Sequence, residues 1–287
     1  MARGVVDVAE AETNVKAAVP ASGALRARII SASVMAPLAL AAVWFGGWAF
    51  HAMVLAGALM LTYEWDRLCE GNGFGAVARL HGAVVLMAVG FAMAEMFATS
   101  LFMVGLGAVA SFAFAQATDR RRRWPLLASP YICIPCIALI WLRDDTLIGR
   151  DITFWLLATV WATDIGAFAV GRTLGGPKLA PRFSPAKTWS GLVGGMLSAA
   201  LAGYAVAAGF GISNQTILVG LSMVIAAWSQ VGDITESALK RHFGAKDSGS
   251  IIPGHGGFLD RLDGLLFAAP ATAVIVMIST EWGFQWH

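Results

Sequence analysis

Charged residues are scarce in this sequence. Only 13% of its 287 residues are charged, 57% are hydrophobic, and the mean hydropathy is +0.68. A soluble domain carries about 25% charged residues, so the composition excludes an ordinary soluble protein. Cysteine is scarce too, and three residues imply no disulfide framework. Cys133 and Cys136 form a C-x-x-C pair in an apolar run, which we interpret as packing thiols rather than a redox or metal pair.

The N-terminus lacks the basic start of a signal peptide. Asp7, Glu10 and Glu12 lie where basic residues belong, and no clear cleavage site follows. We therefore predict that residues 1–28 form a flexible cytosolic arm. We also find no internal repeat, no low-complexity linker and no soluble domain in the sequence.

The apolar residues are gathered into long runs. A bilayer core of about 30 Å needs about 20 apolar residues per helix, and nine runs approach that length. They cover about residues 29–46, 48–64, 80–97, 101–118, 126–142, 152–171, 189–209, 215–233 and 264–280. The runs are continuously apolar, whereas the strands of a β-barrel alternate. The sequence therefore predicts an all-α, polytopic transmembrane bundle of about nine spans.

The basic residues predict its orientation, because Lys and Arg mark cytoplasmic loops. In the nine-span arrangement, alternate loops carry 18 and 2 of the 20 basic residues. This asymmetry predicts a cytosolic N-terminus and an outer C-terminus. Arg120 to Arg123 then lie inside, and a positive-inside anchor is favoured over a site for anionic lipid.

The chain divides by polarity into the arm, an N-terminal transmembrane part and a C-terminal catalytic part. These parts cover residues 1–28, 29–151 and 152–287, with cytosolic loops at 172–188 and 234–263. In the N-terminal part, Glu95 is expected within the third span, where a carboxylate is costly.

Small residues recur at every fourth position of the seventh run. They are Gly191, Gly195, Ala199, Gly203 and Ala207. Such a stripe lets another helix approach closely. We favour packing inside the bundle, and contact between two copies in a homodimer is the alternative.

The first cytosolic loop follows an intramembrane acid. Asp164 lies about two turns before the basic end of its span and is expected to face a polar cavity. The loop then carries cations and hydroxyls among Gly and Pro, namely Arg172, Lys178, Arg182, Ser184, Lys187 and Thr188. Backbone N–H groups and cations together suit phosphate. The alternative is a positive-inside loop with ordinary turns.

The second loop is more specific. If the eighth span continues as a helix, Asp233, Glu236, Ser237 and Lys240 share one face. Arg241, Lys246 and Asp247 add further charges soon afterwards. Two carboxylates, a hydroxyl and an ammonium on one stripe are poorly explained by solvation alone.

A glycine-rich segment leads from there into the ninth span. Pro253–Gly257 breaks any helix and lets the backbone approach a ligand closely. The next helix is expected to present unpaired N–H groups to an anion. Asp260 and Asp263 suit Mg²⁺, although acids also complement a helix dipole. His255 is either a capping or packing residue or a catalytic base.

These residues resemble a known signature. The run Ser237-x-Leu-Lys240-Arg241-x₄-Lys246-Asp247-x-Gly249-x₂-Ile252-Pro253-x-His255-Gly-Gly257-Phe-x-Asp260-Arg261-Leu-Asp263 is similar to that of the phosphatidate cytidylyltransferases, or CDP-diacylglycerol synthases. The upstream run Asp164-x-Gly166-Ala-Phe…Gly171-Arg172…Lys178-Leu-Ala-Pro…Ser184-Pro-x-Lys187-Thr188-Trp resembles that family's second motif. Phe168 stands where Tyr is common, and Ala186 where a basic residue is frequent. The resemblance covers about residues 160–265.

The resemblance implies a reaction and assigns roles. CTP and phosphatidic acid would give CDP-diacylglycerol and pyrophosphate, with Mg²⁺ as cofactor. Catalysis would fall to Asp233, Lys240, Arg241, Lys246, Asp247, His255, Asp260 and Arg261. Substrate binding would fall to Asp164, Arg172, Lys178, Ser184, Lys187, Thr188, Ser237, Gly256 and Gly257, and metal binding to Asp233, Asp260 and Asp263.

The expected partners are therefore CTP, phosphatidic acid and membrane lipids, without nucleic acid. The expected location is a bacterial inner membrane, with the active site facing the cytosol. A cytidylyltransferase for another lipid phosphate, such as an isoprenoid glycerolipid, is the nearest alternative. An anion or ion transporter is disfavoured, because transporters usually show inverted repeats and polar residues at the membrane midplane.

Overall fold

The chain folds into long helices, connected for the most part by short segments. A computed structural model describes residues 21–71, 73–118, 124–144, 148–249 and 256–281. Its helices are α1 (Ala21–Phe45), α2 (Gly47–Glu70), α3 (Ala76–Met93), α4 (Phe97–Ala117), α5 (Trp124–Asp144), α6 (Gly149–Leu174), α7 (Trp189–Phe210), α8 (Gln215–His242) and α9 (Leu259–Glu281). Each predicted apolar run overlaps one of these helices, which confirms the predicted all-α bundle.

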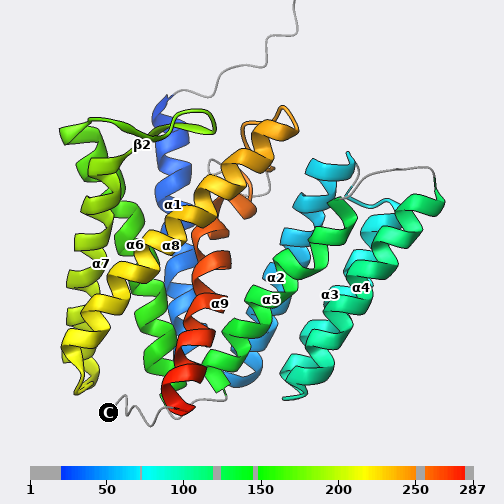
Figure 1. The fold of residues 1–287 in the computed structure, drawn as a ribbon, viewed down its shortest axis with the longest axis horizontal. Coiled ribbons are helices and arrows are strands. Elements are labelled where there is room, and N and C mark those ends of the chain that lie inside the picture. Colours follow the sequence, from blue (N-terminus) through cyan, green and yellow to red (C-terminus); the bar gives the residue numbers. More distant parts are fainter. Residues whose placement is uncertain (1–20, 72, 119–123, 145–147, 250–255, 282–287) are drawn as a thin grey trace, which may run out of the picture.

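Most of these helices suit a bilayer. Seven of the described helices, α3 to α9, are long and apolar enough to cross a membrane. The apolar part of α1, Ser33–Phe45, is shorter, and α2 ends in the polar run Glu64–Glu70. Consecutive helices run in opposite directions (Figure 1), so their connections alternate between two ends. The fold is a polytopic membrane bundle, while nine spans and a cytosolic N-terminus stay predictions.

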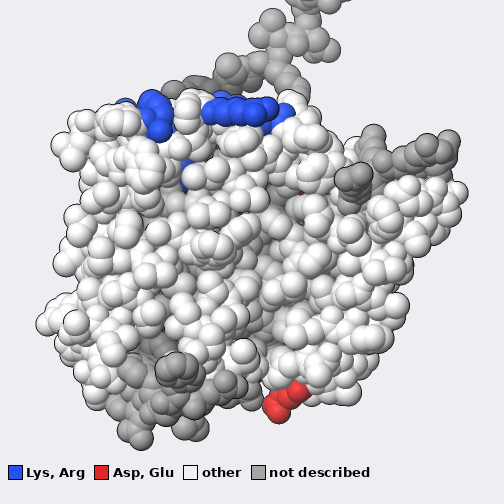
Figure 2. All heavy atoms as spheres, viewed as in Figure 1, with Lys and Arg blue, Asp and Glu red and all other residues white. Residues whose placement is uncertain are grey.

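Basic side chains gather at one end of the bundle. Figure 2 shows Lys and Arg on the face in view at the end where α6 leads into α7. We call this the basic end, and it also holds the last turns of α8 and the first turns of α9 (Figure 1). Both loops with predicted phosphate-binding residues therefore lie at the same end. The run Arg120–Arg123 lies outside the described residues.

The small-residue stripe of α7 lies inside the bundle, as predicted. All five of its members are buried. A Cβ on Gly195 would lie 2.9 Å from the Thr163 carbonyl oxygen of α6, and one on Gly203 would lie 2.0 Å from Ser222 Oγ of α8. These distances leave no room for larger residues, so the stripe holds α6, α7 and α8 together. A homodimer stays a prediction.

The connection between α6 and α7 contains a hairpin that was not predicted. Strand β1 (Lys178–Ala180) pairs antiparallel with β2 (Ser184–Thr188), with Lys178 opposite Thr188. The Thr188 hydroxyl then accepts a hydrogen bond from Gly191 N at 3.0 Å, which caps α7. The predicted loop 172–188 thus contains a β-hairpin instead of ordinary turns alone.

Helix α8 continues to His242, so the first part of the predicted loop 234–263 is helical. At its crossing with α9, a Cβ on Gly232 would lie 2.5 Å from the Asp263 carbonyl oxygen. Farther along α9, a Cβ on Gly264 would be 3.4 Å from Ser229 Cβ. This close crossing brings the acidic residues of the two helices together.

Two further expectations about single residues are settled by the fold. Cys133 and Cys136 are buried and free, as expected for packing thiols. The placement of Glu95 within the third span is wrong. α3 ends at Met93, and Glu95 is exposed in the following turn with φ 61°. An exposed turn spares its carboxylate the cost of burial in lipid.

Candidate active site

Three carboxylates from three helices approach one another at the basic end. Asp164 of α6, Asp233 of α8 and Asp263 of α9 are close enough to interact electrostatically. The glycine crossing at Gly232 explains why the last two meet. Asp164 is exposed on the side of α6, and its facing a polar cavity stays a prediction.

Lys187 of the hairpin joins this acid cluster. Its Nζ lies 2.7 Å from Gln230 Oε1 and forms an ion pair with Asp233. Gln230 Nε2 in turn lies 3.5 Å from Asp164 Oδ1. Strand β2 therefore delivers an ammonium to acids that belong to the transmembrane helices. Arg261 lies near Asp164 and supplies a second positive charge to the cluster.

A second charged cluster occupies the next turn of α8 and α9. Lys240 forms ion pairs with Glu236, at 2.6 Å, and with Asp260. The Glu236 side chain is fully buried, and that of Lys240 is 13% exposed. Of the predicted stripe Asp233, Glu236, Ser237 and Lys240, Lys240 thus pairs with Asp260 of α9, and Asp233 lies near Asp263 of α9.

Asp260 is bound tightly by the polypeptide itself. Its Oδ2 accepts hydrogen bonds from Gly257 N at 2.9 Å, Ser248 N at 3.0 Å and Ser248 Oγ at 3.1 Å. Gly256 has φ 80°, which favours glycine. A Cβ on Gly257 would lie 1.9 Å from Ser248 Oγ. These two glycines therefore allow the chain to turn closely around the Asp260 carboxylate.

The start of α9 is not free to bind an anion, contrary to the sequence-based expectation. Phe258 N and Leu259 N donate to the Glu64 carboxylate at 2.8 and 2.7 Å, and Gly257 N donates to Asp260. An anion does occupy this helix terminus, but a side chain of α2 supplies it. The unpaired N–H groups of a helix terminus favour a negative charge. At the start of α9, the Glu64 carboxylate already supplies that charge.

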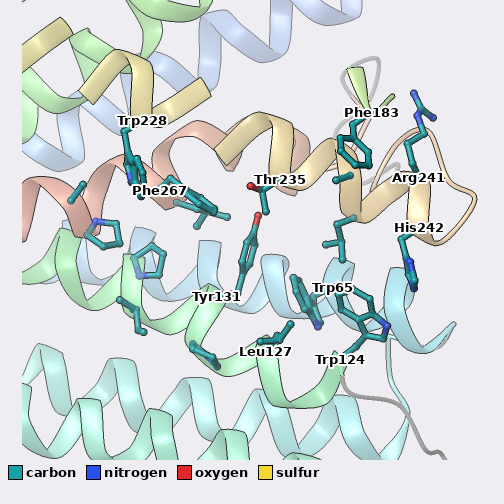
Figure 3. Close-up of a pocket in the computed structure, with 18 of the residues that line it drawn as sticks. Trp65, Trp124, Leu127, Tyr131, Phe183, Trp228, Thr235, Arg241, His242 and Phe267 are labelled. Atoms are coloured by element: carbon teal, nitrogen blue, oxygen red, sulfur yellow. The ribbon is translucent and has the colours of Figure 1, made fainter. Parts of the chain in front are cut away.

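An apolar cavity of about 1140 Å³ lies beside these clusters, between α5, α8 and α9. Figure 3 shows aromatic side chains around it, among them Trp228, Phe267 and Tyr131. Its lining consists of Trp65, Trp124, Leu127, Pro130, Tyr131, Ile134, Pro135, Arg182, Phe183, Trp228, Thr235, Ala238, Leu239, Arg241, His242, Leu266, Phe267, Pro270, Ala271, Val274 and Ile275. The two arginines come from the hairpin turn and the last turn of α8. The cavity is thus apolar along the helices and cationic at the basic end.

The remaining predicted site residues lie around this region without joining either cluster. Arg172 stacks on Phe168, with 5.8 Å between the guanidinium carbon and the ring centroid. Lys178, Lys246 and Asp247 are exposed, Ser184 and Ser237 are half-buried, and Thr188 caps α7. Arg241 donates to the Ala245 carbonyl oxygen at 3.1 Å. His255 lies outside the described residues.

Several residues of the site were not predicted. Glu64 and Gln230 were not assigned a role, Arg182 was named only among the loop cations that suit phosphate, and Glu236 was noted only for its place on the α8 stripe. An acid at the polar end of α2 and a lone amide within α8 are weak signals in a sequence. Glu64 contacts the start of α9, and Gln230 contacts Lys187 of β2 and Asp164 of α6, so only the fold shows what they bind.

Two members of the acid cluster, Asp233 and Asp263, are predicted metal ligands. Two positively charged side chains, Lys187 and Arg261, lie near its three carboxylates. Among the described residues, no group of three or more Asp, Glu, His or Cys side chains is placed to hold a metal ion. A metal site here stays a prediction, and it would need substrate oxygens and water beside one or two carboxylates, as Mg²⁺ usually does.

Known proteins resemble the chain over most of its length. A profile of the cytidylyltransferase family matches residues 26–279. A phosphatidate cytidylyltransferase of Brucella suis biovar 1 (strain 1330) is 40% identical over 247 residues, covering 85% of this chain and 90% of that protein. One of Pseudomonas aeruginosa is 32% identical over 269 residues, covering 90% and 99%. One of Staphylococcus aureus (strain COL) is 41% identical over 132 residues, covering 46% and 51%.

Proposed function

The chain belongs to the cytidylyltransferase family, and on that premise we propose that it converts CTP and phosphatidic acid to CDP-diacylglycerol and pyrophosphate. A phosphate oxygen of the lipid forms a bond to the α-phosphorus of CTP. The bond from that phosphorus to the β-phosphate oxygen breaks, and its electron pair leaves with pyrophosphate. Relatives in three bacterial genera carry the name of this activity, which supports the proposal.

One observation in the structure carries the proposal. Two charged clusters and the cationic end of an apolar cavity meet at the basic end of the bundle. The reaction joins a water-soluble polyanion to a lipid whose chains must stay in an apolar phase. A site with charged groups on one side and an aromatic cavity on the other serves both substrates.

The residues of the cavity suit the lipid. Arg182 and Arg241 at its mouth would bind the lipid phosphate, since guanidinium groups pair well with phosphate oxygens. The acyl chains would lie along the rings between α5, α8 and α9. The lipid phosphate is already ionised at pH 7 and needs no dedicated base, so catalysis can rest on alignment and charge neutralisation.

Lysines of both clusters would neutralise the phosphates of CTP. Lys187 and Lys240 are each held by buried or half-buried carboxylates, which orient their ammonium groups. Such preorganised charges stabilise the negative charge that develops on the transferred group and on pyrophosphate. Lys246 and Arg261, both exposed, would bind the β- and γ-phosphates.

We propose Mg²⁺ as the cofactor, held by Asp233 and Asp263 with Asp260 one turn away. Asp260 Oδ2 already accepts three hydrogen bonds, so Asp260 would bind the metal through Oδ1, which pairs with Lys240 in this structure. When bound, Mg²⁺ would neutralise phosphate charge and fix the orientation of the nucleotide. Asp164 would then act on the neighbouring positive groups rather than on the metal.

We also propose that the basic end faces the cytosol across a bacterial inner membrane. Cytosolic CTP would reach the clusters from that side, while the lipid enters from the leaflet. The 18-to-2 distribution of basic residues between alternate loops supports this orientation.

The direct test uses purified protein in detergent with labelled CTP, Mg²⁺ and phosphatidic acid. We expect a CDP-lipid and pyrophosphate in equal amounts. A correctly folded sample that makes no CDP-lipid contradicts the proposal. A parallel reaction with an isoprenoid glycerolipid phosphate tests which lipid tail the enzyme prefers. A higher kcat/KM with that lipid would identify it, rather than phosphatidic acid, as the substrate.

Variants of the two arginines test the lipid site. Arg182→Ala and Arg241→Ala should each raise the KM for the lipid about tenfold or more, the effect of losing a charged hydrogen bond. The KM for CTP should stay unchanged. Arg79→Ala is the control, because Arg79 is exposed on α3 and donates to the Phe74 carbonyl oxygen. Equal lipid KM values in all three variants would remove the arginines from the site.

A further inference from the structure

One carboxylate of the N-terminal helices reaches the segment that carries Asp260. Glu64 lies on α2 and is fully buried. Its Oε1 accepts from Phe258 N at 2.8 Å, and its Oε2 accepts from Leu259 N at 2.7 Å. These N–H groups begin α9 and have no partner within the helix. Glu64 therefore fixes the start of α9 from a helix almost two hundred positions earlier.

Ser248 connects this carboxylate to Asp260. Its Oγ lies 3.2 Å from Glu64 Oε2 and 3.1 Å from Asp260 Oδ2. A hydroxyl has one proton to donate, so Ser248 donates to one carboxylate while contacting the other. Ser248 N also donates to Asp260 Oδ2 at 3.0 Å. Glu64 and Asp260 thus hold the same serine from two sides.

The packing around Glu64 leaves it little freedom. A Cβ on Gly249 would lie 2.5 Å from Glu64 Oε1, and one on Gly257 would lie 2.8 Å from Oε2. The Phe258 ring in turn packs against Gly57 of α2, where a Cβ would lie 3.4 Å away. The chain on both sides of the carboxylate therefore follows its shape closely.

We propose that Glu64 is a positioning residue for cytidylyl transfer. It sets the place of Gly257, Ser248 and the first turn of α9, and through them the orientation of Asp260 and its partner Lys240. It also occupies the helix terminus that would otherwise attract a phosphate. The inference rests on the proposed function, because the orientation of Asp260 matters only if this site binds the nucleotide.

The test compares two buried carboxylates of the same helix. Glu64→Gln keeps the shape but loses the charge and replaces one acceptor with an amide donor. Asp66→Asn is the matched control, because Asp66 is equally buried on α2 and pairs with His81 at 2.7 Å. Readouts are kcat, the KM for each substrate, and the Kd of labelled CTP without lipid. KM and Kd do not depend on the fraction of folded protein.

We expect Glu64→Gln to lower kcat and to raise the Kd of CTP about tenfold, as for a lost charged hydrogen bond. The KM for the lipid should change less than about twofold, because the cavity does not contact Glu64. Asp66→Asn should leave the Kd of CTP unchanged. If both variants bind CTP like the parent protein, or if both weaken it equally, Glu64 has only a structural role.

Ser248→Ala keeps the test decisive if Glu64→Gln does not fold. It removes the hydroxyl between the two carboxylates but keeps both N–H bonds to Glu64. We expect a smaller rise in the Kd of CTP and a fall in kcat, and parent values for both would overturn the inference. A parent protein that makes no CDP-lipid contradicts the proposed function itself. An active parent with unaffected variants contradicts only the role of Glu64.

Discussion

Two lysines organise the charged side chains at the basic end. Lys187 faces Asp233, and one turn away Lys240 lies between Glu236 and Asp260. Buried ion pairs add little net stability, because desolvation offsets most of the attraction. Their value here is to hold charges in place for anionic substrates. Loss of one partner is a different matter, since it leaves a buried charge uncompensated.

The first prediction concerns that loss. Lys240→Met leaves both Glu236 and Asp260 without their shared partner and should destabilise the protein by about 3–5 kcal/mol. The double variant Glu236→Gln/Lys240→Met should recover much of this loss yet stay inactive. Denaturant unfolding in detergent measures the difference. Lys246→Met, at an exposed lysine, should unfold like the parent protein. Unaltered stability of Lys240→Met would show that Glu236 is not charged in the folded state.

The second prediction separates folding from turnover at Asp260. Asp260→Asn keeps the size of the side chain but loses the charge that faces Lys240 and replaces one acceptor with a donor. We expect kcat to fall at least about 100-fold, the scale of a lost electrostatic group in an active site. Membrane insertion, measured by the amount in the membrane fraction, should be unchanged. Retained turnover would exclude Asp260 from the catalytic groups.

Among the elements, the helices were predictable and their pairings were not. Long apolar runs indicate spans by themselves, and the glycine stripe of α7 indicated close packing correctly. The hairpin escaped prediction because its strands are short, lack an alternating pattern and lie among three prolines, Pro177, Pro181 and Pro185. The capping of α9 by a side chain also escaped prediction, because the capping carboxylate, Glu64, lies on α2. Contacts between distant segments depend on the assembled bundle.

The crossing of α8 and α9 leads to the third prediction. A side chain at Gly232 would collide with the Asp263 carbonyl oxygen, so Gly232→Leu should push the helices apart. We expect a loss of about 1–3 kcal/mol from overpacking and a large fall in kcat, because Asp233 and Asp263 separate. Gly220→Ala on the same helix is the control, since a Cβ there meets nothing within 4 Å. Thermal unfolding and turnover would be compared, and parent-like turnover of Gly232→Leu contradicts the close crossing.

Over the whole molecule, the N-terminal helices do more than anchor the chain. The sequence suggested a catalytic C-terminal part preceded by spans without chemistry. In the structure, Trp65 of α2 and Tyr131 of α5 line the cavity, and Glu64 caps α9. A large part of the hydrophobic core also includes residues from both parts. The site therefore depends on the assembled bundle. This explains why the sequence predicted the charged residues of the site but not its apolar cavity.

The last prediction tests the orientation of this bundle in the membrane. Pro181 is exposed at the hairpin turn of the basic end, and Ser213 is exposed in the connection at the other end, with α7 between them. The natural cysteines are buried and should react slowly with a membrane-impermeant thiol reagent. In intact spheroplasts, Ser213→Cys should be labelled, whereas Pro181→Cys should be labelled only after the membranes are opened. The reverse pattern would put the basic end outside, away from CTP. Equal labelling in intact spheroplasts would mean that α7 does not cross the bilayer.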